Sequence, residues 1–326
     1  NAYAVGGNVD MSFVRNAILS PESRGIRTFV ETFGSTVTTE AADNAIVALS
    51  RPIRMSVQDD SLGEDSPVAV TVARNLMVAG STSEMVDVSV FPTESAIALN
   101  GTFANNVFVG FEDFEEGTPS GAIGIDASTT PPVALAAVHN SVIGPFDGPV
   151  FQFNVDPVGE GSTVDVVDNL IDAPVASAAD VVSVMSNPVN VTSTISNNLA
   201  PVAGTGLVEG SPTYESVITD VFIFREEDGL RFSVASGNTP ALGARLLLVG
   251  EAFARVVSDV SGSDVELDGP ARAVAVGDVI GLVLSPASGP FPTYGLVPGT
   301  TGADAASDEG DIGASGGAMP YVPLMP

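Results

Sequence analysis

The sequence predicts an all-β fold, a parallel β-helix or solenoid, with a small antiparallel β insert towards its C-terminal end. Three observations predict it. A short motif centred on Asn returns every 22–34 residues, alternating apolar and polar stretches precede it, and Gly, Pro or acidic residues follow it. Period-two alternation rich in Val and Ile indicates short strands, and no stretch longer than a turn or two has helical periodicity.

The repeated motif holds its Asn at one fixed place, as in "RNAIL" (15–19), "DNAIVA" (43–48) and "RNLMVA" (74–79). Successive markers lie 28, 31, 31, 34, 29, 29 and 22 residues apart. They are Asn16, Asn44, Asn75, Asn106, Asn140, Asn169 and Asn198, with Asp220 in the equivalent place of an eighth repeat.

A repeat of this length with about three short strands is typical of a solenoid in which each repeat forms one coil. Coils stack at about 4.8 Å, the ordinary spacing of neighbouring strands, so we expect the markers to form a column of hydrogen-bonded side-chain amides. Asn tolerates the left-handed backbone conformation, which predicts that each marker occupies a sharp corner between strands. The apolar residues after each marker are expected to point into the core.

Three regions follow from the pattern. Residues 1–245 are predicted to form the parallel β-helix, residues 246–300 a small antiparallel unit, and residues 301–326 a closing motif and an apolar, Pro-rich tail. Within the second region, residues 254–284 alternate cleanly between "SGSD" and "DGPA" turns. Such a unit is expected to cap or decorate the solenoid, because uncovered strand edges invite aggregation. The first marker, Asn16, has no amphipathic helix before it, so that end is expected to stack on something unless the chain is a fragment.

The motifs resemble secreted, right-handed parallel β-helix proteins of the pectate-lyase-like superfamily. The coil pattern covers about residues 10–235; "LRFSVASGNTPALGA" (230–244) and "DEGDIGASGG" (308–317) resemble segments that close the coil in that family. The resemblance implies a right-handed helix and secretion. The catalytic motifs of the lyases, with Trp-Ile-Asp-His and paired Arg, are absent from the sequence.

Composition excludes several classes of function. The 326 residues carry 40 Asp and Glu against 11 basic residues, all of them Arg, for a net charge of −29. Such a field repels phosphate backbones, so nucleic acid is a poor partner, and no apolar run is long enough for membrane insertion. Without Cys the chain has no disulfide and no thiolate metal site. Many solvated carboxylates without Lys suggest adaptation to high salt or to divalent cations.

Catalytic candidates are few. Glu94, Asp126 and Asp156 lie at similar distances before successive markers, where stacked carboxylates would suit acid/base cleavage of a polysaccharide. Against this, the chain has no Trp and only four Tyr to serve as sugar platforms, and no Arg between Arg74 and Arg225. With 40 acidic residues, a solvated ladder of carboxylates is the simpler interpretation. The single His, His139, has no recognisable nucleophile partner and is expected to be a packed corner residue.

Two further kinds of site are candidates. The turn at 304–311 is dense in carboxylates, and we consider Asp304, Asp308 and Asp311 as calcium ligands because hard oxygen donors are the only metal ligands on offer. Asn100 and Asn190 begin N-glycosylation sequons.

These observations favour a non-catalytic, extracellular or cell-surface structural protein. We expect a self-assembling subunit of a filament, sheath or surface layer, joined through the solenoid end and the C-terminal tail by main-chain hydrogen bonds. The tail could equally pack on its own solenoid. The alternatives are a polysaccharide lyase or glycoside hydrolase of the tailspike type, and a carbohydrate-binding adhesin. Calcium is the only cofactor that the residues suggest.

Overall fold

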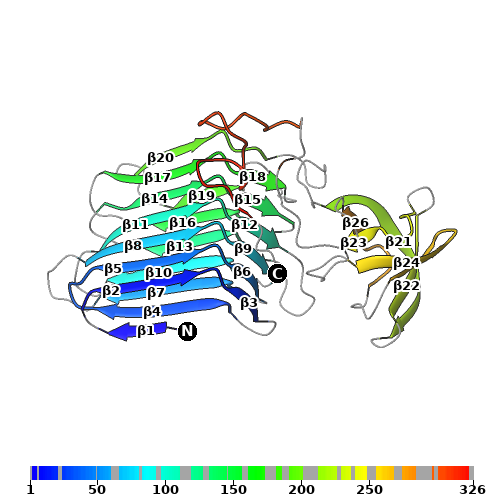
Figure 1. Cartoon of the computed structure of the whole chain (residues 1–326), viewed down its shortest axis with the longest axis horizontal. Helices are drawn as coiled ribbons and strands as arrows, with labels where there is room; N and C mark the ends of the chain where they lie inside the picture. Colours follow the sequence, from blue (N-terminus) through cyan, green and yellow to red (C-terminus); the bar gives the residue numbers. More distant parts are fainter. Residues whose placement is uncertain are drawn as a thin grey trace.

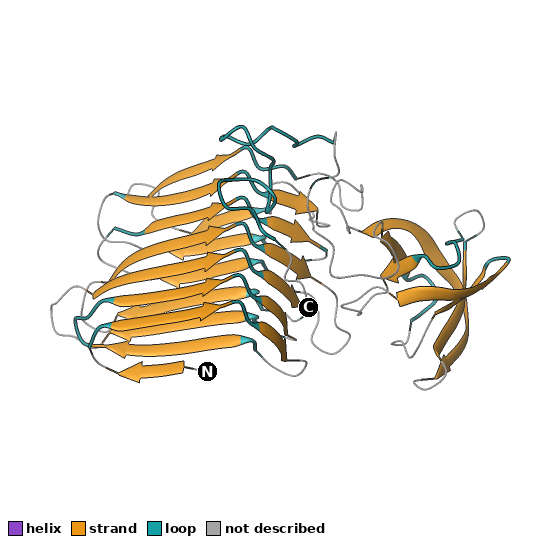
Figure 2. Ribbon diagram, viewed as in Figure 1, coloured by secondary structure: helices purple, strands orange, loops and turns teal. Residues whose placement is uncertain are grey.

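The structure is a computed structural model, and its regular elements are all β strands (Figure 2). This confirms the predicted all-β class. The described residues are 2–5, 7–20, 24–48, 50–59, 66–80, 83–92, 97–110, 119–127, 132–144, 146–155, 161–172, 181–185, 191–200, 212–225, 229–235, 239–247, 255–267, 274–283, 296 and 300–322.

Three parallel sheets form the larger part of the molecule (Figure 1). The first contains β1 (Ala2–Val5), β4 (Ile26–Thr32), β7 (Ile53–Asp59), β10 (Val86–Pro92), β13 (Ile123–Ala127), β16 (Phe151–Val155) and β19 (Val182–Met185). The second contains β2 (Val9–Val14), β5 (Val37–Ala42), β8 (Ser66–Ala73), β11 (Ile97–Ala104), β14 (Ala134–Val138), β17 (Ser162–Val167) and β20 (Val191–Ser196). The third contains β3 (Ala17–Ser20), β6 (Ala45–Ala48), β9 (Leu76–Ala79), β12 (Val107–Gly110), β15 (Ser141–Ile143) and β18 (Leu170–Asp172).

Consecutive strands belong to different sheets, and each strand pairs in parallel with the strand one repeat before it and one repeat after it. Val70 of β8, for example, lies opposite Thr39 of β5 and Gly101 of β11. Each repeat is therefore one coil, and the stack of coils is the predicted parallel β-helix.

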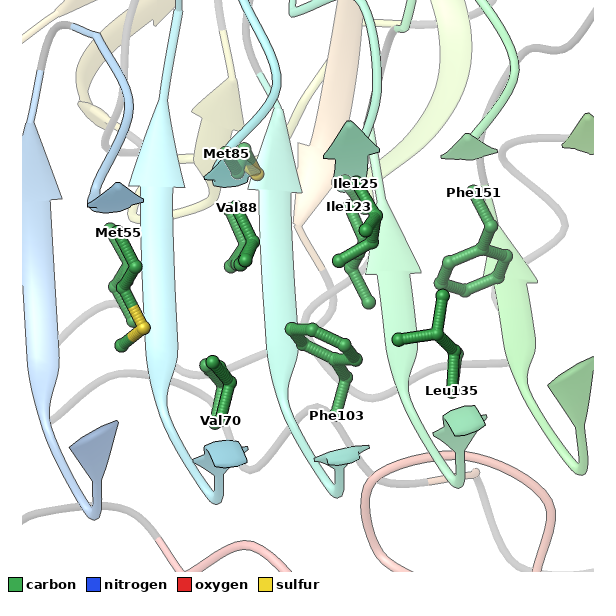
Figure 3. Close-up of a cluster of buried hydrophobic side chains, with 14 of the residues drawn as sticks. Met55, Val70, Met85, Val88, Phe103, Ile123, Ile125, Leu135 and Phe151 are labelled. Carbon is green, nitrogen blue, oxygen red and sulfur yellow. The ribbon is translucent and has the colours of Figure 1, made fainter. Parts of the chain in front are cut away.

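The solenoid interior is filled by alternate residues of the strands. In β8, Val68, Val70 and Val72 are buried, while the residues between them face outwards and are partly or fully exposed. Figure 3 shows how aromatic and aliphatic side chains from successive coils meet inside, among them Phe103 and Leu135. This period of two is the pattern from which the strands were predicted.

The third sheet is apolar on both faces, which corrects the expectation that all residues after each Asn point inwards. Met77 and Phe108 join the solenoid core, but their neighbours face out into a second apolar cluster. That cluster consists of Leu76, Val78, Val107, Ile143, Leu170, Ala306, Ile312, Ala314 and Tyr321. The closing motif therefore covers the side of the solenoid and does not only close its end.

The antiparallel unit is larger than predicted. It is a closed barrel of β21 (Pro212–Arg225), β22 (Gly229–Val234), β25 (Asp264–Leu267), β24 (Arg255–Ser261), β23 (Arg245–Leu247) and β26 (Val279–Val283), in that pairing order. It has its own core, which includes Phe232 and Leu246.

The predicted boundary at 245/246 was consequently wrong. β21 and β22 belong to the barrel, and "LRFSV" (230–234) pairs antiparallel with β25 and β21 instead of closing the coil. Asp220 is an exposed residue of β21 and is not an eighth marker.

Candidate functional site: the asparagine column and the end coils

The seven marker asparagines form one continuous column along the corner between the second and third sheets. In each of the first six, the backbone N–H and the side-chain Nδ2 both donate to Oδ1 of the Asn one coil further on, at 2.8–3.1 Å. The other Nδ2 hydrogen reaches back to a carbonyl of the preceding coil, as from Asn106 to Val72 at 2.8 Å. The side chains of Asn75, Asn106 and Asn140 are fully buried, so the column supplies their hydrogen bonds where water is absent.

The left-handed corner lies one residue before each Asn, which corrects the prediction that the Asn itself adopts it. These preceding residues are Arg15, Asp43, Arg74, Asn105, His139, Asp168 and Asn197, with φ between 52° and 59°. The strained turn aims the next residue into the coil, where its amide hydrogen-bonds to the column. Because the turn residue points away from the column, its identity varies from coil to coil.

Two of these turn residues form an ion pair on adjacent coils. Arg74 donates to both oxygens of Asp43, from Nε at 2.7 Å and from the terminal nitrogen at 2.9 Å. The hydrogen bond from Arg74 holds the pKa of Asp43 below its ordinary value. The bidentate geometry fixes this corner more firmly than a single contact between flexible side chains would.

The column has a direction. Its oxygen-bearing end is Asn16 in the first coil, and its last member is Asn198, whose Nδ2 donates to the carbonyl of Val166. Within the described residues no asparagine precedes Asn16 or follows Asn198 in the column. At the first end, the Oδ1 acceptor of Asn16 has no preceding Asn to bind. At the other end, Asn198 has the same backbone N–H and Nδ2 donors that every other member uses to bind the next Asn.

The interior side chains are uncovered at both ends of the described solenoid. We call β1–β3 (2–20) the first coil and β19–β20 with the following corner (182–199) the last coil. In the first coil Val9, Met11 and Phe13 are only partly buried, whereas the residues opposite them in β5 are 0–2% exposed. In the last coil Ile195 is 52% exposed, although its partner Val166 is fully buried.

Charge is scarce at these two ends. No Asp, Glu, Lys or Arg occurs between Val181 and Val208, and the first twenty residues hold only Asp10 and Arg15, which offset each other. In a chain of net charge −29, two ends without net charge and with uncovered interior side chains are surfaces suited to contact with another β structure.

The closing motif packs beside the column, against the left-handed corners. Asp168 accepts hydrogen bonds from the backbone N–H and the hydroxyl of Ser307, and Ser141 accepts one from the N–H of Ala314 at 2.9 Å. Asn105 donates to the carbonyl of Gly316 at 2.6 Å. A side chain at Gly316 would collide with the carbonyl of Asp311, so glycine is required there.

His139 is a buried corner residue beneath this motif. Its Nε2 lies 3.8 Å from a carboxylate oxygen of Asp168 and 3.5 Å from one of Asp308, and its buried Nδ1 makes no hydrogen bond. The hydroxyl of Ser307 is directed at Asp168 and not at the imidazole, so these groups do not have the order of a nucleophile, base and orienting acid.

The three aspartates considered as calcium ligands serve the turn of the closing motif. Asp311 Oδ1 accepts from the N–H of Asp304 and Asp308 Oδ1 accepts from the N–H of Gly310, both at 3.1 Å. Among the described residues no group of three or more His, Cys, Asp or Glu side chains is placed to hold a metal ion. Asp304, Asp308 and Asp311 therefore do not form such a group.

Of the carboxylates considered for catalysis, only Asp126 lies within the described residues; Glu94 and Asp156 lie outside them. Asp126 is exposed on β13, accepts a hydrogen bond from Asn154 at 3.1 Å, and has Ser89 opposite it on the other side. Its neighbours in register are thus polar but not acidic. Asn100 is exposed on β11, and the other sequon, at Asn190, lies outside the described residues.

The tail is anchored on its own solenoid as far as Tyr321. Tyr321 is buried in the second apolar cluster, and its N–H donates to the carbonyl of Ala314 at 2.8 Å. Met319 and Val322 are exposed. The sequence left this packing open as the alternative to docking on a neighbouring subunit, and strands apolar on both faces, such as "LMVA" (76–79), carry a signal for it.

Alkaline pH is expected to release the closing motif. Burial raises the pKa of the Tyr321 phenol to about 12, whereas the phenol of an unfolded chain titrates near 10. A group whose pKa is raised on folding contributes stability that is complete below pH 10 and is lost as pH rises through 12. Ultraviolet difference absorbance between the protein and a Tyr321→Phe variant should show one phenolate forming near pH 12. Titration of that phenol near pH 10 would show that it is not buried.

Within the described part of the chain, no helix has the length and apolar character needed to cross a membrane. Comparisons with protein-family models, curated proteins and solved structures found no match to this chain.

Proposed function

We propose that this protein is an extracellular structural subunit whose parallel β-helices join head to tail into filaments. The observation that carries the proposal is the pair of ends without net charge, each with uncovered interior side chains, in a chain of net charge −29. The net negative charge of the chain lies outside these ends and repels other copies, so the ends are where contact costs least electrostatically. High salt weakens the remaining repulsion and favours assembly.

Head-to-tail joining continues the asparagine column, the apolar interior and the parallel strand pairing from one copy into the next. Placing Asn198 of one copy below Asn16 of the next extends the asparagine column by the same hydrogen bonds that join its other members. In that register Ile195 meets Phe13, and the outward-facing Thr194 meets Ser12. The edge strands β19 and β20 of one copy then pair in parallel with β1 and β2 of the next, which is β-augmentation between copies. Such a contact is heterologous and does not close on itself, so it generates filaments.

The register can be tested by cross-linking, because the chain contains no Cys. Opposed residues of neighbouring strands lie about 4.8 Å apart, within the range of Cα distances that a disulfide spans. Ser12→Cys and Thr194→Cys variants, mixed and oxidised, should give a disulfide-linked dimer. Each variant alone should give far less, because each then carries its thiol at one end only.

An Asn100→Cys variant is the matched control, since Asn100 is an outward-facing strand residue in a middle coil. Mixed with either end variant, it should give no dimer above background. Electron microscopy of the unmodified protein at high and low salt supplies the independent measurement. If filaments form but the disulfide between residues 12 and 194 does not, the proposed register is wrong although the protein still assembles. If the protein stays monomeric under every condition, the proposed function is wrong.

A further inference from the structure

Four of the eleven arginines lie together on the outer edge of the first sheet. Arg27 of β4 lies directly opposite Arg54 of β7, and Arg24 and Arg51 occupy the same place in the turns that lead into these strands. Like charges directly opposite each other on neighbouring strands are destabilising. In a chain with almost four acidic residues for each basic one, this concentration of positive charge requires a reason.

Acidic neighbours do not balance the group. In the described residues one carboxylate, Asp87 of β10, pairs with it: Asp87 Oδ2 lies 3.2 Å from Nε of Arg51 and 3.4 Å from Nε of Arg54. Glu84 is close in sequence, but its side chain lies across Gly124 of the following coil, where a Cβ would meet its Cγ at 2.5 Å. In the part of the chain that the structure describes, four guanidinium groups thus share one carboxylate.

The donors of this group are unsatisfied. The Nε atoms of Arg24, Arg51 and Arg54 are buried and make no hydrogen bond, in spite of the ion-pair distances to Asp87. A buried donor without an acceptor is unfavourable, because it has lost its hydrogen bonds to water. Burial, followed by the charges of Arg54, Arg27 and Arg51, lowers the pKa of Arg24. Among the residues that the structure describes, this site therefore has an excess of positive charge and three guanidinium donors without a hydrogen-bond acceptor.

We propose that Arg24, Arg27, Arg51 and Arg54 form a binding site for a doubly charged oxyanion, a sulfate or phosphate group. A guanidinium presents Nε and a terminal nitrogen as a fork that matches two oxygens of such a group. Arg24 and Arg27 lie one coil from Arg51 and Arg54, so guanidinium groups of both coils could bind the oxygens of one tetrahedral anion. The same chemistry admits a free inorganic ion or a sulfate or phosphate ester on a larger molecule.

The strained backbone of Arg51 is consistent with this role. Its φ is +39°, outside the seven left-handed corners of the asparagine column, and non-glycine residues in such conformations cluster at functional sites. Gly25 permits the close approach, because a Cβ there would meet the carbonyl of Pro52 at 2.6 Å. The backbone next to Arg24 therefore packs closely on the backbone next to Arg51.

Thermal unfolding in sodium sulfate, sodium phosphate and sodium chloride at equal ionic strength tests the site. A bound anion should raise Tm by about 5 °C once it is in hundredfold excess over its Kd. Sulfate also stabilises proteins generally by exclusion from their surface, so the decisive quantity is the difference between variants. Arg24→Gln should lose the anion-specific shift, while Arg231→Gln, which removes the same charge from the barrel, should keep it.

The anion-free proteins supply a second readout. If the arginines serve a ligand, Arg24→Gln should be at least as stable as the unmodified protein in chloride, because it relieves repulsion among like charges. If they serve only the fold, that variant should be less stable and should respond to sulfate like the unmodified protein. The second pattern would overturn the proposal. Equilibrium dialysis with radiolabelled sulfate or phosphate, and competition by a sulfated or phosphorylated sugar, then distinguishes a free ion from an ester.

Discussion

Replacing Asn106 with Ala is expected to destabilise the protein by about 4 kcal/mol, the largest effect of a single truncation in the column. The Asn106 amide accepts from the N–H and Nδ2 of Asn75 and donates to Asn140 and Val72. Alanine leaves the N–H of Asn75 and the carbonyl of Val72 buried without these partners. Each orphaned group costs about 1–3 kcal/mol, and the vacated space adds to that cost.

Asn100→Ala is the matched control, because Asn100 lies in the same coil but faces solvent. Its effect should stay within about 0.5 kcal/mol, as is usual for surface substitutions. Asn16→Ala should fall between the two, because the N–H of residue 16 still reaches Asn44 and no marker precedes it within the described residues. Denaturant unfolding of the three variants measures these differences. Equal losses for Asn106→Ala and Asn100→Ala would show that the column does not stabilise the fold.

The column and the coil were predictable from the sequence because one geometric requirement recurs in each repeat. Each coil needs an amide at the same height and corner, and Asn has the shortest side chain that carries both an NH2 group with two donors and a carbonyl acceptor. The left-handed residue before it was not predictable, since Arg, Asp, Asn and His all occupy that place. The coil geometry imposes the left-handed conformation at this position, so the conformation does not restrict which residue type occurs there.

The barrel boundary and the side packing of the closing motif were missed for a different reason. Alternation alone does not tell a parallel strand from an antiparallel one, so "TYESVITDVFIF" (213–224) was assigned to the coil although it begins the barrel. The lateral position of "DIGASGG" depends on contacts between residues more than a hundred positions apart, such as Ser141 with Ala314. The arginine group is likewise invisible without the register that places Arg27 against Arg54.

Replacing Ile195 with Asp is expected to abolish filament formation without unfolding the subunit. Ile195 is already 52% exposed in the monomer, so the substitution removes little buried surface from the fold. In the head-to-tail contact it lies against Phe13 of the next copy, where a carboxylate would be buried without a partner. An unpaired buried charge costs about 3–5 kcal/mol, which weakens each contact by roughly a hundredfold or more.

Thr194→Asp adds the same charge to the same strand but on the outward face, and it should assemble nearly normally at high salt. The direction of the contact gives a further test. An Ile195→Asp chain keeps an intact first coil, so it can still join the last coil of an unmodified copy but cannot be extended in turn. Mixed with unmodified protein, it should shorten filaments in proportion to its mole fraction, as measured by electron microscopy or sedimentation. If filaments of the mixture keep their length, or if both variants assemble alike, the growing contact does not involve the interior face of the last coil.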